Sequence, residues 1–141
     1  MARRLDWEDL MEIYPGIDID GLSEEAHHHG GVLLKFWQKM MRNDDDARIM
    51  LFYTVVYFVN TDNFFDGAEG DIFEYAFGDQ QLYYDGLASY RRNNGEALVE
   101  SAISHMSPDV KESFLRLGCC FFGAKGHMRD EEKAKIRRLT R

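Results

Sequence analysis

The chain has 141 residues, of which 45% are hydrophobic and 13% aromatic, and its formal net charge is −8. This composition excludes an intrinsically disordered chain, because it supplies enough apolar surface for a core, and the length is that of a single domain. The negative charge argues against direct binding to nucleic acid, whose phosphates would repel it, and favours a basic protein partner.

The N-terminal third of the chain predicts two helices. Asp6 is a suitable N-cap for a first helix that ends before Pro15, because the residue before a proline disfavours helical backbone. Residues 17–21 alternate apolar and polar side chains, which indicates a short extended connection. A second helix is expected over residues 23–42, and the Gly30-Gly31 pair is a point where it would bend or break.

An almost wholly apolar run occupies residues 49–59 and follows three consecutive carboxylates, Asp44 to Asp46. Carboxylates suit a helix N-terminus, where the backbone N–H groups and the helix dipole favour negative charge. Eleven residues are long for a strand, and no partner strand is evident in the chain. We therefore expect a central buried helix over residues 46–60.

The rest of the chain predicts a loop and more helices. Residues 61–70 are rich in Asp, Asn and Gly, which is typical of a loop. Gly78, Asn94-Gly95 and Ser107-Pro108 mark boundaries between further helices, expected over 71–77, 80–93, 96–106 and 108–122. Residues 129–139 are highly charged and are expected to fray or project. The predicted fold class is all-α: one compact domain of seven or eight helices around the buried helix.

Charge is unevenly distributed along the chain. Neither residues 5–34 nor residues 49–90 contain a Lys or Arg. Residues 1–124 carry 22 acids and 10 bases, a net charge of −12, whereas residues 125–141 carry seven bases and three acids, a net charge of +4. We therefore expect an acidic helical domain over 1–124 and a basic C-terminal helix or tail over 125–141.

The location of the protein is indicated by what the chain lacks. The N-terminus has no apolar segment of the kind that a signal peptide requires, and the longest apolar run is about half of a bilayer-spanning helix. The only cysteines, Cys119 and Cys120, are adjacent and predict packed thiols in a reducing cytoplasm, with a redox or metal pair as the alternative. We expect a cytoplasmic protein that does not contact membranes.

Two sets of side chains resemble metal sites. His27, His28 and His29 are consecutive, and neighbours on a helix point about 100° apart, so the three cannot share one ion. A second set resembles a loose calcium loop without the alternating spacing and terminal bidentate Glu of such a site: Asp62, Asp66, Glu69 and Asp71. We expect no metal or cofactor at either. No nucleophile motif or phosphate loop is present, and a metal-dependent enzyme stays as an alternative.

Residues 69–77, with the sequence EGDIFEYAF, carry a resemblance to a known family. The segment resembles the N-G-G-F-x-Q-Y-F motif of a bacterial DNA-mimic protein family, with Gly70 and Tyr75 in agreement and Ile72 and Glu74 as near matches. The resemblance extends over residues 46–115. It implies an all-helical protein whose surface carboxylates imitate DNA phosphates and so occupy a DNA-binding protein.

The functional hypothesis is an acidic inhibitor of a basic nucleic-acid-binding protein, such as a transcription factor, a nuclease or a phage-defence effector, in a bacterium or phage. Its charged face is expected to comprise Asp62, Asp66, Glu69, Asp71, Glu74 and Asp79, with Asp18, Asp20, Glu24 and Glu25 as a second patch. Ten Phe and seven Tyr exceed what the core readily hides, so some, Phe64 and Phe65 among them, are expected on a partner-binding or homodimer surface. The alternative is a helical interaction or scaffold protein whose acidity only confers solubility.

Overall fold

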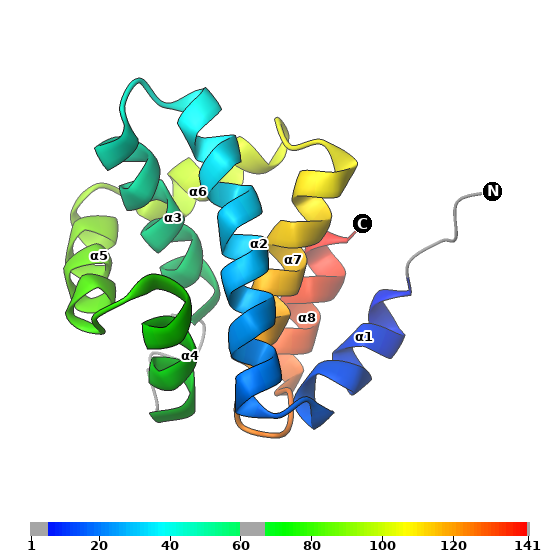
Figure 1. The fold of residues 1–141 in the computed structure, drawn as a ribbon. Coiled ribbons are helices and arrows are strands. Elements are labelled where there is room, and N and C mark those ends of the chain that lie inside the picture. The colour runs from blue at the N-terminus through cyan, green and yellow to red at the C-terminus, as the bar shows by residue number, and fades with distance from the viewer. Residues whose placement is uncertain (1–5, 60–66, 141) are drawn as a thin grey trace.

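The computed structural model describes residues 6–59 and 67–140, and within these ranges its regular elements are all helical (Figure 1). In chain order they are α1 (Trp7–Ile13), the short 3-10 turn η1 (Tyr14–Gly16), α2 (Ile19–Met40), α3 (Asp44–Val59), α4 (Gly67–Phe77), α5 (Gln81–Arg92), α6 (Gly95–Ile103), α7 (Pro108–Phe122) and α8 (Asp130–Leu139). The expected all-α class is confirmed, and the helices pack into one compact domain.

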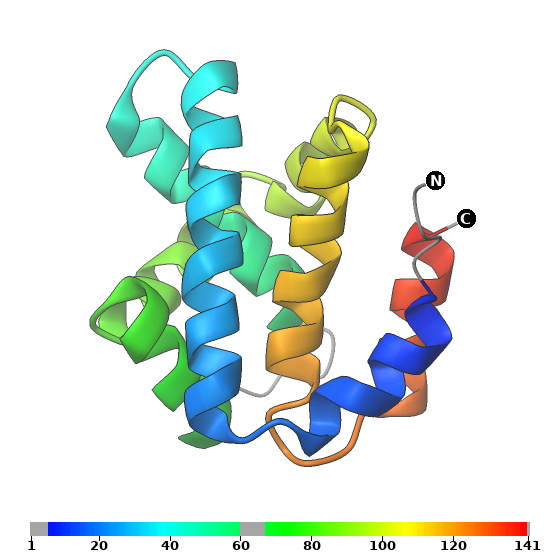
Figure 2. The same cartoon turned by 45° about the vertical axis from the view of Figure 1, so that its right-hand side comes forward.

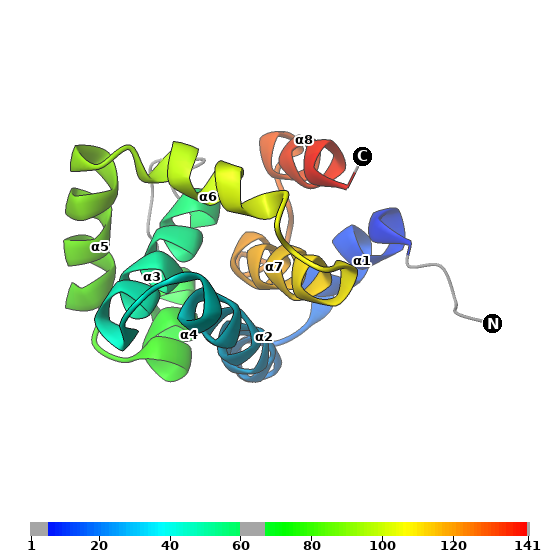
Figure 3. The ribbon, with the colours of Figure 1, turned by 90° about the horizontal axis from the view of Figure 1, so that it is seen from above.

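Helix α3 forms the centre of the core. It begins where the Asn43 side chain accepts a hydrogen bond from the backbone N–H of Asp46 at 2.8 Å. Ten of its 16 residues are buried, and α2, α5, α6 and α7 pack around it (Figure 3). The expected buried helix is therefore confirmed. Neither α3 nor any other helix in the described ranges is long and apolar enough to cross a bilayer.

Helix α2 is longer at its N-terminus than the sequence suggested. The carboxylate of Asp18 accepts a hydrogen bond from the backbone N–H of Gly21 at 2.8 Å, so Asp18 caps a helix that begins at Ile19. The expected extended connection over 17–21 is therefore wrong beyond Asp18. The expected break at Gly30-Gly31 is also absent: α2 continues through both glycines (Figure 2).

Gly30 is needed where α2 meets α4. A Cβ atom on Gly30 would lie 2.5 Å from Cε1 of Phe77, closer than side-chain contacts allow. The absence of a side chain therefore lets the Phe77 ring, at the end of α4, pack directly on the α2 backbone. Helix α4 itself begins at Gly67, four residues before its expected start at Asp71.

Helix α8 packs on the domain instead of projecting from it, so the expected frayed or projecting segment is wrong. Ile136 and Leu139 are buried against the core. Arg137 forms an ion pair with Glu8 on α1, in which Nη2 lies 2.8 Å from Oε1. Figure 2 shows α8 beside α1. A few apolar side chains are enough to dock α8 on the domain, because they all lie on one face of this short amphipathic helix.

Lys135 joins α8 to the end of α3. Its ammonium donates a hydrogen bond to the carbonyl oxygen of Tyr57 at 2.5 Å and lies 3.8 Å from the centre of the Tyr57 ring. A cation at this position complements the carbonyl groups at the C-terminal end of a helix. Burial nevertheless lowers the pKa of Lys135 to about 8, although Glu96 acts in the opposite direction.

This lowered pKa makes the stability of the fold depend on pH. Between pH 8 and pH 10 the unfolded chain keeps a proton on Lys135 that the folded protein releases, so the contribution of Lys135 to the free energy of unfolding rises with pH. We expect a rise of about 1–2 kcal/mol over this window, allowing for partial exposure of the amine to solvent. Urea unfolding at several pH values should show this rise as a growing difference in the free energy of unfolding between the wild type and Lys135→Met. The buried thiols of Cys119 and Cys120, whose raised pKa acts in the opposite direction, are the same in both proteins. An equal slope in both proteins would contradict this assignment.

Candidate functional site

Helices α2 and α4 bring the two base-free stretches of the sequence together. The N-terminal part of α2 belongs to residues 5–34, and α4 belongs to residues 49–90. The two helices pack side by side (Figures 1 and 3), and Nδ1 of His27 lies 3.3 Å from the carbonyl oxygen of Ala76. Two segments far apart in the sequence, neither of which contains a Lys or Arg, thus become neighbours in the fold.

The first group of acids, which we name the α4 acidic set, consists of Asp71, Glu74 and Asp79. All three are exposed. Glu74 accepts a hydrogen bond from Nε2 of Gln80 at 3.1 Å, and Asp79 accepts one from the backbone N–H of Gln81 at 2.8 Å, at the start of α5. These bonds hold the carboxylates on the surface and leave lone pairs for a partner's cations.

The second group, the α2 acidic set, consists of Asp18, Asp20 and Glu24, which are also exposed. Glu25, expected with them, has a different role. Its carboxylate accepts a hydrogen bond from the Tyr14 hydroxyl at 3.2 Å and pairs with Nε2 of His29 at 3.2 Å. Glu25 is therefore partly exposed but is engaged within the fold by these two contacts, whereas the other three acids of the expected second patch are exposed.

Glu69, expected in the first group, is buried. Its side chain is 1% exposed, because α4 starts at Gly67 and thereby places Glu69 on the same buried face as Ile72 and Phe73. The expectation that Glu69 belongs to the charged face is therefore wrong. The remaining expected site residues lie outside the described ranges: Asp62, Phe64, Phe65 and Asp66.

The three consecutive histidines point in different directions, as expected. His27 contacts α4, where its ring lies edge-on to Tyr75 at 6.3 Å between centroids, while His28 is exposed and His29 is buried. In the described part of the chain, no group of three or more His, Cys, Asp or Glu side chains is arranged to hold a metal ion.

His29 connects α2 to α7 through a buried polar network that the sequence did not reveal. Its Nδ1 lies 3.0 Å from Oγ of Ser113, and its Nε2 lies on Glu25. The Tyr14 hydroxyl donates to Glu25 and accepts from Nη1 of Arg116 at 3.1 Å. Burial lowers the pKa of His29. Ser, His and Glu in series resemble a hydrolase triad, but Ser113 and His29 are both buried, so this network stabilises packing.

The adjacent cysteines are free and fully buried in α7. Burial raises the pKa of Cys119 to about 12 and raises that of Cys120 well above its ordinary value. A thiol with a raised pKa carries little of the thiolate that reacts or binds metal. The expectation of two packed thiols is confirmed.

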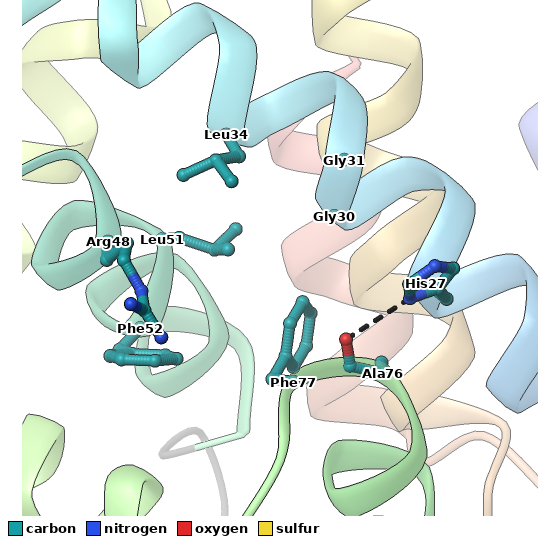
Figure 4. A pocket seen from close by; sticks show the side chains of 9 residues that line it. All are labelled: His27, Gly30, Gly31, Leu34, Arg48, Leu51, Phe52, Ala76 and Phe77. Atoms are coloured by element: carbon teal, nitrogen blue, oxygen red, sulfur yellow. Dashed lines mark hydrogen bonds between the residues drawn. The ribbon is translucent and has the colours of Figure 1, made fainter. Parts of the chain in front are cut away.

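A pocket of about 390 Å³ opens between α2, α3 and α4 (Figure 4). Gly30 and Gly31 leave one wall without side chains, and Leu51 and Phe77 supply apolar walls. Arg48 extends from α3 at the side of the pocket opposite His27. No single stretch of sequence could indicate this pocket, because three helices form it. The Gly30-Gly31 pair was noted in the sequence only as a point where the helix would bend or break.

Comparison of this chain with protein-family models, curated proteins and solved structures found no match. Its function is therefore inferred from the placement of its own side chains, in which the α4 and α2 acidic sets on two adjoining helices are the most distinctive feature.

Proposed function

We propose that the protein is an acidic inhibitor that binds the basic surface of a nucleic-acid-binding protein. The observation that supports the proposal is the packing of α2 against α4, which brings two base-free stretches, with the exposed acids of the α2 and α4 acidic sets, onto adjoining helices. The resemblance of residues 69–77 to the motif of a bacterial DNA-mimic family points to the same function.

The proposed mechanism is electrostatic competition with nucleic acid. Duplex DNA carries one phosphate charge per ~1.7 Å of its axis, and a protein that binds it presents Lys and Arg in a cleft. Carboxylates such as Asp71 and Glu74 would occupy those cations, and opposite fields would accelerate the encounter. Tyr75 is 61% exposed next to Glu74, so it would add an apolar contact that salt does not screen.

The proposed partner is a basic protein that binds nucleic acid: a transcription factor, a nuclease or an effector of phage defence. Inhibition would follow from occupation of the nucleic-acid cleft and needs neither a cofactor nor a chemical step. If the partner is a defence nuclease, the protein would act as an anti-defence protein of a bacterium or phage.

A salt-dependent capture experiment tests the proposal. The immobilised protein is expected to capture a basic host protein at about 50 mM salt and to release it at about 0.5 M, because a Debye length of a few ångströms screens exposed charges. Replacing the α4 acidic set by amides, with Asp71→Asn, Glu74→Gln and Asp79→Asn together, is expected to weaken the complex at least about tenfold.

A matched control changes the net charge equally at acids that lie elsewhere. Asp9→Asn, Asp109→Asn and Glu131→Gln together remove three exposed carboxylates from α1, α7 and α8. This control is expected to bind like the wild type. Equal loss of binding in both triple variants would mean that only the net charge matters, and mimicry by a defined face would then be rejected.

The alternative of an interaction protein without mimicry is favoured by exposed apolar side chains on other helices. Ile13 is 55% exposed and Leu98 is 46% exposed. Apolar contacts of this kind respond little to salt. A captured partner that stays bound at about 1 M salt, and that the α4 triple variant also binds, would support this alternative.

A further inference from the structure

Helix α2 presents an exposed stripe along which the sign of the charge reverses. Asp20 and Glu24 lie in its N-terminal half, and Lys35 and Lys39 lie in its C-terminal half. At 100° per residue these four positions fall within an arc of about 100°, so they share one side of the helix. All four are exposed, and α2 lies at the edge of the helix bundle (Figure 3).

Contacts within the described fold explain none of these four charges, and the helix dipole explains only two of them. None of them has an ion-pair partner among residues 6–59 and 67–140. The dipole favours acids in the first turn and bases in the last turn, which accounts for Asp20 and Lys39. Glu24 and Lys35 lie beyond those turns, where the dipole no longer has an effect.

We propose that this stripe pairs with the same stripe of a second copy of the chain, with the two α2 helices antiparallel. A twofold axis that passes between His29 and Gly30 places Asp20 opposite Lys39 of the second copy and Glu24 opposite its Lys35. The symmetry repeats both pairs, so one register satisfies all eight charges. A self-complementary surface of this type is the basis of a twofold homodimer.

The centre of the stripe is shaped for a close approach. The same register places Gly31 opposite His28 of the second copy. A Cβ atom on Gly31 would meet nothing within 4 Å, so the fold itself gives no packing reason for glycine there. The missing side chain leaves space for the ring of His28 from the opposite helix.

The spacing of the charges also selects the angle between the helices. Asp20 and Lys39 lie about 14 Å along the helix from the axis, at 1.5 Å per residue. Two helices that cross at about 20° diverge by only about 5 Å at that distance, whereas a crossing near 50° separates them by about 12 Å. The shallow crossing keeps the two helix axes closer at both pairs, so the dimer is expected to resemble an antiparallel coiled coil.

An apolar groove lies beside the charged stripe on one side. A groove of about 480 Å³ runs along the basic half of α2 and is lined by Val32, Phe36 and Met40. Met40, at the C-terminal end of α2, is 45% exposed. The seam covers Asp20 and Glu24 of the α2 acidic set and leaves the α4 acidic set open, so a dimer would present the α4 acidic set to a basic partner.

Charge reversal with rescue tests the dimer in the full-length chain. Sedimentation velocity at about 50 mM salt, from about 10 µM to 1 mM protein, is expected to show a monomer–dimer equilibrium in the wild type. The variant Asp20→Lys with Glu24→Lys, and the variant Lys35→Glu with Lys39→Glu, are each expected to be monomeric. An equimolar mixture of the two is expected to form a heterodimer, because every facing pair is then of opposite sign.

Gly31→Gln gives an independent test that leaves the charges unchanged. The fold has open space at this position, so the thermal midpoint should not fall, whereas the longer side chain should raise the dimer dissociation constant at least about tenfold. A monomeric wild type over the whole concentration range, or reversal variants that associate as the wild type does, would overturn the proposal. The α4 triple variant should dimerise normally, which separates failure of this seam from failure of the inhibitor function.

Discussion

Replacing Phe58 by alanine is expected to lower the free energy of unfolding by about 3–5 kcal/mol. Phe58 is fully buried in α3, and its ring packs on Phe114 of α7 at 4.8 Å and on Phe122 at 5.7 Å between centroids. Its removal leaves a cavity that the surrounding rings, themselves fully buried, can fill only in part. Such a loss is a large fraction of the roughly 5–15 kcal/mol that a domain of this kind has.

Denaturant unfolding followed by circular dichroism measures this loss. Tyr75→Ala removes an aromatic ring of similar size from α4, where 61% of the side chain is exposed, and is expected to change the free energy of unfolding by less than about 0.5 kcal/mol. A Phe58→Ala variant within about 1 kcal/mol of the wild type would show that α3 is not the centre of the core.

The second large effect is expected from replacing Gly118 by alanine, which should lower the free energy of unfolding by about 1–3 kcal/mol. A Cβ atom at Gly118 in α7 would lie 2.5 Å from Cε1 and 2.6 Å from Cδ1 of Phe58. The Phe58 ring cannot move aside, since the rings of α7 hold it. The added methyl group therefore forces a shift of α7 relative to α3.

Gly31 supplies the matched control for this substitution. It also lies within a helix, but a Cβ atom there would meet nothing within 4 Å. Gly31→Ala is therefore expected to raise stability by about 0.5–1 kcal/mol, through the better helix propensity of alanine. The same chemical change should thus have opposite signs at the two glycines. Combining Gly118→Ala with Phe58→Leu should recover part of the lost stability, and an additive loss would contradict a direct clash.

The surface acids show how far sequence patterns reach. Asp71, Glu74 and Asp79 were expected to be exposed, and they are, because their positions fall on the outer side of α4 or at the start of α5. Glu69 and Glu25 were expected beside them, yet Glu69 is buried and Glu25 is tied to Tyr14 and His29. The exposure of an acid depends on where its helix begins and on which distant segments pack against it. Neither can be read from the composition of the chain.

The amino-acid sequence by itself determined the all-α class, the buried helix around Phe58 and the caps at Asp6 and Ser107. These features follow from local chemistry: side chains that bond to nearby backbone N–H groups, and an apolar run too long for a strand. Only the tertiary structure decided that α8 docks on α1 and α7 and that α2 and α4 unite two base-free stretches. Such contacts depend on which helix faces meet, and that is set by packing between residues far apart in the chain.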